Sequence, residues 1–250
     1  MSGHSKWATI KHKKGAADIK RGKLFGKLIR QVEVAAREGG GDPEMNPSLR
    51  TMYQKARDSS VPLDTIERAI KRGTGELEGV TYEQVTYEGY APNGVAVLVE
   101  VLTDNRNRAG SEIRSLFTRG GGSLAEPGAV AWQFERKGVI VLPKKVSEDD
   151  LMEAVLEAGG DDVIDDGDTW RVLCEPSTLT AVRAALEEAK IEFDSADADM
   201  QPTTSVALET AEAAKSVLRL MDALDDHDDV QNVSSNFDID DSLMQQLESV

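Results

Sequence analysis

The sequence has a single cysteine, no long apolar run and no apolar N-terminal signal, and each shortage excludes a class of protein. It holds one cysteine, Cys174, so no internal disulfide is possible and a reducing compartment is expected. No apolar run approaches the roughly 20 residues of a membrane-spanning helix. The N-terminal stretch lacks the apolar centre of a secretory signal, and its basic pattern runs straight into an expected helix. These features predict a cytoplasmic protein with no membrane partner.

Motifs of the common enzyme classes are also missing. The sequence contains no Walker A loop, no HExxH and no CxxC pair. Cys174 and His227 lie far apart in the sequence, which makes a Cys–His nucleophile a poor hypothesis. The acidic run at 225–229 offers ligands for a divalent cation, but such runs more often form solvated loops. His4 and His12 have no partners at metal-ligand spacing. We therefore predict a non-enzymatic protein with no metal site and no cofactor.

Positive charge is scarce overall but concentrated at one end of the chain. The formal net charge is −16, yet residues 1–75 hold 16 basic and 8 acidic side chains and so carry a net charge of +8. The rest of the chain carries −24. Such a division is typical of proteins whose basic segment binds a polyanion, and an uneven solvated surface is the alternative.

A basic amphipathic helix is expected from about Ala17 to just before the glycines at 39–41. Its apolar side, at 100° per residue, carries Leu24, Phe25, Leu28, Ile29, Val32 and Ala36. Its other side carries Lys20, Lys23, Lys27, Arg30 and Arg37. Stacked like charges repel by roughly a few tenths of a kcal/mol per pair, so these cations do not favour the helix by themselves. A phosphate backbone alongside would reverse the sign of that effect.

Two further helices complete an expected helical domain over 1–75. Asn46-Pro47 is a cap followed by proline at the first helical position, and a third helix follows Pro62 and ends at Gly73. Each helix has one apolar side, so the three can share a small core.

A basic arm precedes these helices. Its cations are Lys6, Lys11, Lys13 and Lys14. They surround Trp7, and an aromatic ring among cations suits a nucleic-acid arm because the ring can stack on a base. The alternative is that Trp7 and Ile10 fold back onto the helices as a small apolar patch.

The remaining chain is expected to form two α/β units, one inserted in the other. Strands are predicted over 81–90 and 94–104 around an Asn93-Gly94 turn, followed by a helix and further strands at 129–135 and 138–143. From 138 the order becomes strand 138–142, helix 147–158, strands 161–166 and 169–175, helix 177–189 and strand 191–199. This βαββαβ order is the split ferredoxin-like plan.

The C-terminal segment has no partners of its own. It is expected to hold a strand at 203–208, a helix from Glu209 to about Leu224 and a last strand near 230–237. We therefore predict an α+β fold with a discontinuous α/β domain, 80–135 and 200–250, around an inserted domain, 137–199. Both α/β domains are predicted to be ferredoxin-like.

The stretch TDNRNRAGSE is the strongest single candidate site. It follows a buried strand, and Asn105 or Asn107 can cap the helix that begins there. Arg106 and Arg108 add charge to a helix start, where free N–H groups attract anions such as a nucleic-acid phosphate. The alternative is that the two arginines pair with the protein's many carboxylates.

Five stretches give the chain a resemblance to a known family. They are GHSKWATIKHKKGAADIKRGKLFGKLIRQ, GGGDPEMNP, VEVLTDNRNR, GGSLAEPGAVAWQFERKG and DALDDHDDVQNVSSNF. With these the chain resembles the YebC family over nearly its full length; that family includes the mitochondrial translational activator of cytochrome c oxidase. The resemblance implies three domains with a helical N-terminal one, and a DNA-binding transcriptional regulator. Other members of the family act on the ribosome and help translation through proline-rich sequence.

Taken together, the residues and the resemblance predict a nucleic-acid-binding regulator of gene expression. DNA is one expected partner, and ribosomal RNA or tRNA on the ribosome, with basic ribosomal proteins facing the acidic domains, is the other. A lysine row suits phosphates better than base edges, and no helix-turn-helix is evident. A monomer is expected.

Overall fold

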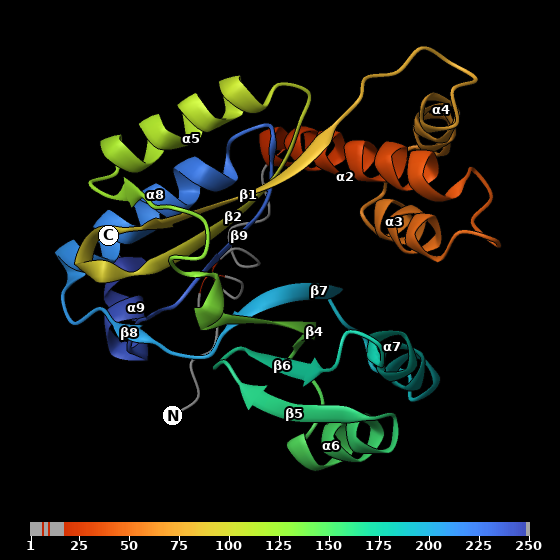
Figure 1. Ribbon diagram of the computed structural model, residues 1–250. Coiled ribbons are helices and arrows are strands. Elements are labelled where there is room, and N and C mark those ends of the chain that lie inside the picture. Colours follow the sequence, from red (N-terminus) through yellow and green to blue (C-terminus); the bar gives the residue numbers. More distant parts are fainter. Residues whose placement is uncertain (1–6, 8–9, 11–17, 249–250) are drawn as a thin grey trace.

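The chain is an α+β protein in which a helical domain precedes two antiparallel sheets with their helices (Figure 1). The computed structural model describes Trp7, Ile10 and residues 18–248. Within those residues, no helix is long and apolar enough to cross a membrane. The predicted α+β class with an N-terminal three-helix domain is confirmed.

The helical domain consists of α2 (Asp18–Gly39), α3 (Pro47–Asp58) and α4 (Leu63–Gly73). Asn46 caps α3, because its side chain accepts a hydrogen bond from the backbone N–H of Leu49 at 3.0 Å. The same side chain donates to the carbonyl oxygens of Ala35 and Gly40, both at 2.8 Å, and so ties α3 to the end of α2. The buried side chains of this domain's own core include Leu28, Val32, Ala36, Leu49, Ala56 and Ile66.

The first sheet carries two helices on one face. Its strands, in sheet order, are β3 (Ser123–Leu124), β1 (Glu83–Tyr90), β2 (Ala96–Thr103) and β9 (Val230–Ser235). Neighbouring strands are antiparallel. Side chains alternate across a strand, so Val97, Val99 and Val101 of β2 share one face. There they join the core that holds the apolar sides of α5 (Arg106–Arg119) and α8 (Ala211–Asp225).

The other face of the first sheet is covered by a loop. Ala96 and Leu98 of β2 pack there against Val130 and Phe134. The sequence predicts a strand over 129–135, and that prediction is wrong: residues 131–133 form a 3₁₀ turn, and β4 begins at Phe134.

A buried carboxylate explains the missing strand. Glu88 of β1 accepts hydrogen bonds from the backbone N–H groups of Gly128 at 2.6 Å, Val130 at 2.7 Å and Ala131 at 2.8 Å. Those N–H groups are therefore satisfied by a side chain and not by a neighbouring strand. Burial alone would raise the pKa of Glu88, but the three N–H groups hold it below its ordinary value.

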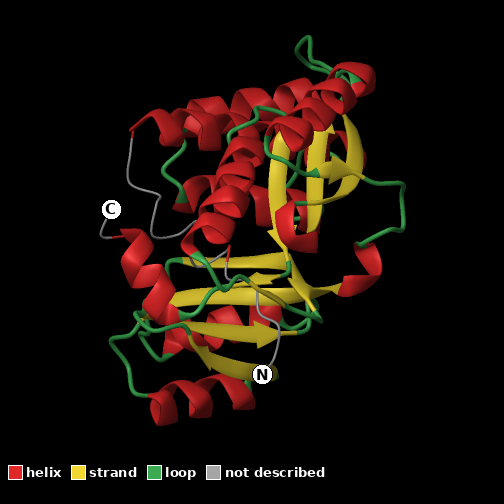
Figure 2. Cartoon of the chain, turned by 90° about the vertical axis from the view of Figure 1, so that its left-hand side faces the viewer, coloured by secondary structure: helices red, strands yellow, loops and turns green. Residues whose placement is uncertain are grey.

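The second sheet lies below the first in both views of the chain (Figure 2). Its strands, in sheet order, are β5 (Gly160–Asp165), β6 (Thr169–Cys174), β4 (Phe134–Pro143) and β7 (Ser195–Pro202). Helices α6 (Glu148–Glu157) and α7 (Leu179–Glu188) complete its core. The predicted strand–helix–strand–strand–helix–strand order is present, and each element begins within four residues of its predicted start.

The first sheet has a different chain order from the second. Its elements follow as β1, β2, α5, β3 and, after the second sheet, α8 and β9, so the prediction that both α/β units are ferredoxin-like is wrong for this one. The predicted hairpin turn at Asn93-Gly94 is confirmed: both residues have positive φ, and the turn joins β1 directly to β2.

The C-terminal segment returns to the first sheet through β9, which pairs with β2. Two short strands, β8 (Val206–Ala207) and β10 (Phe237–Asp238), pair in parallel, and α9 (Asp241–Glu248) follows. The predicted strand at 203–208 is thus reduced to two residues. The domain boundaries at 80–135, 137–199 and 200–250 stay predictions.

Candidate nucleic-acid interface

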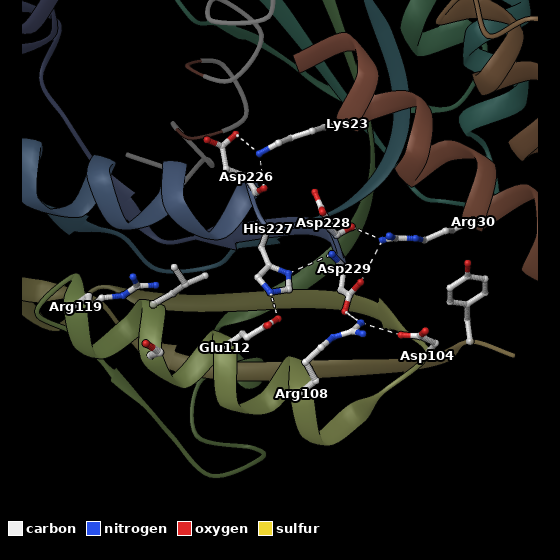
Figure 3. A pocket seen from close by; sticks show the side chains of 13 residues that line it. Lys23, Arg30, Asp104, Arg108, Glu112, Arg119, Asp226, His227, Asp228 and Asp229 are labelled. Atoms are coloured by element: carbon white, nitrogen blue, oxygen red, sulfur yellow. Dashed lines mark hydrogen bonds and ion pairs between the residues drawn. The ribbon is translucent and has the colours of Figure 1, made fainter. Parts of the chain in front are cut away.

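The basic face of α2 lies against an acidic loop that joins α8 to β9 (Figure 3). We call residues 225–229, with the sequence DDHDD, the acidic loop. Lys23 Nζ donates to the carbonyl oxygen of Asp226 at 2.8 Å, and Lys27 Nζ donates to the carbonyl oxygen of Asp225 at 2.6 Å. One turn further along α2, Arg30 donates to the carbonyl oxygen of Asp228 and lies 3.3 Å from Oδ1 of Asp229.

The placement of these cations follows from the end of α8. The last carbonyl groups of a helix have no partner within it and carry partial negative charge, so cations are stabilised there. The carboxylates of Asp225 and Asp226 reinforce this effect, at 3.6 Å from Lys27 Nζ and 3.9 Å from Lys23 Nζ. As a result Lys27 is only 9% exposed. Lys27 is therefore not open to a phosphate in this conformation, and its assignment to nucleic-acid binding stays a prediction.

Asp229 connects the acidic loop to the start of α5. Its Oδ2 accepts hydrogen bonds from Thr103 Oγ1 and from Arg108 Nη2, both at 2.8 Å. Burial alone would raise the pKa of Asp229, but the hydrogen bonds from Arg108 and Thr103 and the charges of Arg108 and Arg30 hold it below its ordinary value. Asp229 is thus an ionised, buried carboxylate held by two cations from different helices.

Asn105 caps α5, as one of the two predicted alternatives had it. Its side chain accepts from the backbone N–H of Arg108 at 3.0 Å. Arg108 also pairs with Asp104, at 2.8 Å, so this arginine follows the alternative of pairing with local carboxylates. Arg106 is exposed, and its carbonyl oxygen accepts from the Tyr87 hydroxyl at 3.2 Å. Of the two arginines, Arg106 is the one without an ion-pair partner among the described residues, which leaves it available to a phosphate.

His227 has a defined tautomer in this arrangement. Its Nδ1 accepts a hydrogen bond from the backbone N–H of Asp229 at 3.1 Å. The other ring nitrogen, Nε2, lies 2.8 Å from a carboxylate oxygen of Glu112 on α5 and donates to it. The histidine therefore joins the acidic loop to α5, and both of its ring nitrogens are already engaged in hydrogen bonds.

These contacts surround a polar groove of about 780 Å³. Its charged walls are the cations Lys23, Arg30, Arg108 and Arg119 and the carboxylates Asp104, Glu112, Asp226, Asp228 and Asp229. Cations and carboxylates are nearly equal in number, so the groove as it stands is no strong attractor for a polyanion. Among the described residues no group of three His, Cys, Asp or Glu side chains is arranged to hold a metal ion.

The arm residues have different outcomes. Lys6, Lys11, Lys13 and Lys14 lie outside the described residues, and Lys20 lies on α2 with its side chain outside the description. Trp7 is 2% exposed and packs with Ile10 in the core of the first sheet. Its predicted role in stacking on a base is therefore not available in this conformation. The alternative, that Trp7 and Ile10 fold back as an apolar patch, agrees better with the structure. The ring packs in the core of the first sheet, however, and not in the helical domain's own core.

Sequence reasoning missed Asp229, Thr103 and the partnership of the acidic loop with α2. The run DDHDD at a helix end was visible, and it was interpreted as a solvated loop. The only indication of the pairing in the sequence is that the charge of this run is opposite to that of α2. Nothing in the sequence pairs two segments about 200 residues apart.

Comparison with known proteins gives a consistent result along the whole chain. The family model "TACO1/YebC protein N-terminal domain" matches residues 5–76, and the model "TACO1/YebC second and third domain" matches residues 82–237. A "probable transcriptional regulatory protein" of Mycolicibacterium smegmatis is 58% identical over 250 residues, covering 99% of each chain. One of the same name from Rubrobacter xylanophilus is 59% identical over 249 residues, again covering 99% of each chain.

A solved structure has the same fold. The crystal structure of a conserved hypothetical protein from Aquifex aeolicus matches with a TM-score of 0.86 and 47% sequence identity. The match covers 95% of this chain and 98% of that one. The shared fold thus extends over nearly the whole of both chains.

Proposed function

The chain belongs to the TACO1/YebC family, and we propose that it is a non-enzymatic regulator of gene expression that binds nucleic acid through the basic face of α2 and the N-terminal arm. The relatives carry the name of transcriptional regulators, which favours DNA as the partner. Arg106 at the start of α5 adds a separate, rigidly placed cation.

One observation carries this proposal. Lys23, Lys27 and Arg30 each hold an anionic or carbonyl oxygen of the acidic loop, at successive turns of one helix. A row of cations that coordinates a row of oxygens has the chemistry needed for successive phosphates. Such contacts position a nucleic acid without reading its bases, so the binding would be strong, salt-dependent and weakly specific.

Ribosomal RNA is the second candidate partner, and the charge of the sheets favours it. The part of the chain after residue 75 carries a net charge of −24 and would be repelled by bare duplex DNA. On a ribosome, that surface could face basic proteins while α2 contacts RNA phosphates. The exposed acids of α6 illustrate such a surface: Glu148, Asp149, Asp150, Glu153 and Glu157.

The direct test is binding measured against salt. Affinities of the full chain for random duplex DNA, random single-stranded RNA and purified ribosomes would be measured between low and physiological salt, with the triple substitution K20E/K23E/K27E. We expect the parent's affinity to fall steeply with salt and the substituted chain to bind at least about tenfold more weakly.

A matched control separates α2 from total charge. The substitution K144E/K145E/K190E changes the net charge by the same amount on exposed lysines of the second sheet's unit. If both triple variants lose the same affinity, α2 is not the binding surface. Comparison of the three ligands at matched salt then decides between DNA and the ribosome.

A further inference from the structure

The acidic loop occupies the cations that the proposed function assigns to phosphates. We propose that the loop is an internal competitor, so that nucleic acid binds α2 by replacing residues 225–229 as the partner of the α2 cations and opening the contact between the helical domain and the first sheet, while Asp229 keeps its bonds to Arg108 and Thr103. This inference rests on the proposed function, and it adds a closed state and an open state to it.

The geometry of the loop is that of an anion substitute. Three cations on successive turns of α2 meet carbonyl oxygens of Asp225, Asp226 and Asp228, and two of these contacts measure 2.6 and 2.8 Å. Carboxylate oxygens of the same loop also lie near these cations, at 3.3 to 3.9 Å from the lysine and arginine nitrogens. The loop therefore offers each cation both a hydrogen-bond acceptor and a negative charge, as a phosphate group does.

The contact between α2 and the acidic loop consists of polar and charged groups, which favours its reversible opening. The side chains of Lys23 and Asp226, at one end of the contact, are 38% and 58% exposed, so water and salt weaken their pairing, whereas Lys27 is more buried and Arg30 lies between the two. Among the described side chains of α2, the buried apolar ones pack in the helical domain's own core, and none belongs to the core of the first sheet. As far as the described side chains of α2 show, opening this contact would thus uncover charged groups and no apolar core.

The second contact of the helical domain has the same character. Lys55 of α3 lies 2.8 Å from Asp197 of β7, and Asp58 lies 3.1 Å from Arg183 of α7. Ion pairs between partly exposed side chains therefore hold α3 to the second sheet's unit as well. Trp7 and Ile10 remain in the core of the first sheet, so an opened helical domain stays tethered to it.

Competition follows from these charges. A phosphate approaching α2 in the closed state meets the carboxylates of Asp225, Asp226 and Asp228 and is repelled. A polyanion that contacts several cations at once gains enough to displace the loop, whereas a single phosphate does not. The loop would therefore lower affinity for all nucleic acids and exclude small anions.

The test neutralises the loop without removing its hydrogen-bond acceptors. The substitution D225N/D226N/D228N keeps side-chain shape, and Asp229 stays unchanged because it holds Arg108 and Thr103. The control E148Q/D149N/E153Q removes the same three charges from α6. Affinities of both variants and the parent for random duplex DNA and single-stranded RNA would be compared at low salt.

We expect the loop variant to bind at least about tenfold more tightly than the parent and the α6 variant to gain much less. Equal gains in the two variants would reduce the effect to net charge and overturn the proposal. Parent and loop variant binding equally would also overturn it, while leaving nucleic-acid binding itself intact. Failure of the parent and both variants to bind any nucleic acid would overturn the proposed function and the competition together.

A second measurement reads the closed state directly. A carbodiimide that joins amines to carboxylates without a spacer should link Lys27 to Asp225 in the free parent, since Nζ and Oδ1 lie 3.6 Å apart. Saturating duplex DNA or RNA should abolish that link, detected by mass spectrometry of peptides. A link that persists in the bound complex would contradict displacement of the loop.

Discussion

Two clusters of paired charges in this protein have opposite properties. In the second sheet's unit, Arg171 is fully buried, with Nε 2.9 Å from Oδ2 of Asp166 and Nη2 donating to Oδ1 at 3.0 Å. At the acidic loop, Lys23 and Arg30 of one domain meet oxygens of another and remain partly exposed. Burial lowers the pKa of Arg171, and the Asp166 carboxylate opposes that effect.

The difference shows which ion pairs can take part in a switch. Breaking a fully buried pair leaves a charge without solvent or partner, so that pair contributes to architecture and does not exchange. A partly exposed pair between domains can trade its partner for water or for a phosphate at small cost. The location of a charge cluster, within one core or between two, therefore decides its role more than the number of charges does.

Removing the buried cation should have the greatest effect on stability. The substitution Arg171→Ala leaves the buried Asp166 carboxylate without this cation, and it should lower the free energy of unfolding by about 3–5 kcal/mol. Urea denaturation followed by circular dichroism would measure it. Nucleic-acid affinity of the folded molecules should not change.

An exposed arginine provides the comparison for Arg171. Arg68 pairs with Asp64 at 2.5 Å on the outside of α4, and Arg68→Ala should change stability by about 0.5 kcal/mol or less. Similar losses for the two substitutions would contradict the structural role given to the buried pair.

The carboxylate of Glu88 gives a second test of a buried charge, this time paired only with backbone. Glu88→Gln keeps one acceptor oxygen and leaves at least one of the three N–H groups, of which that of Val130 is buried, facing an amide NH₂ group, so stability should fall by about 1–3 kcal/mol. Exposed Trp132 lies on the loop that Glu88 holds, and its fluorescence should become easier to quench. Glu135→Gln, at an exposed position, should do neither.

Much of this arrangement was visible in the sequence where the determinants are local. The elements between 138 and 199 were predicted because each has its own hydrophobic period and turn. Asn105 as a cap needs only the residue three positions later, Arg108. By contrast, the strand predicted at 129–135 fails because Glu88, some 40 residues earlier, takes its N–H groups.

The candidate site depended on contacts that no local pattern encodes. The cation row of α2 was predicted, but its partner lies about 200 residues away and was read as solvated. For Trp7 the sequence leaves base stacking and fold-back both open, because its polar neighbours do not show which core the ring enters. Sequence patterning identifies which side chains are charged, while folding decides which of them are already paired.

Asp229 lies between the two extremes, because it is buried yet belongs to the acidic loop. Its pKa is below the ordinary value near 3.8, so its ionised form stabilises the fold above that pH, and the contribution is lost as pH falls through the lowered pKa. The parent should therefore be more stable than Asp229→Asn at pH 6, and the difference should shrink as pH falls below 3.8. Unfolding measured across this range would show it; a constant difference would mean that the Asp229 charge is not responsible.

The two arginines at the start of α5 offer the finest comparison, since both were predicted to bind phosphate and only Arg106 is exposed without an ion-pair partner among the described residues. Arg106→Ala should leave the unfolding transition unchanged, lower affinity for the nucleic-acid target about two- to fivefold and reduce the salt slope by about 1, the signature of one lost phosphate contact. Arg108→Ala should instead shift the unfolding transition, because Asp229 and Asp104 lose their partner. If Arg106→Ala leaves both affinity and salt slope untouched, the start of α5 is no part of the interface, and the basic face of α2 with the arm would have to supply all of the attraction.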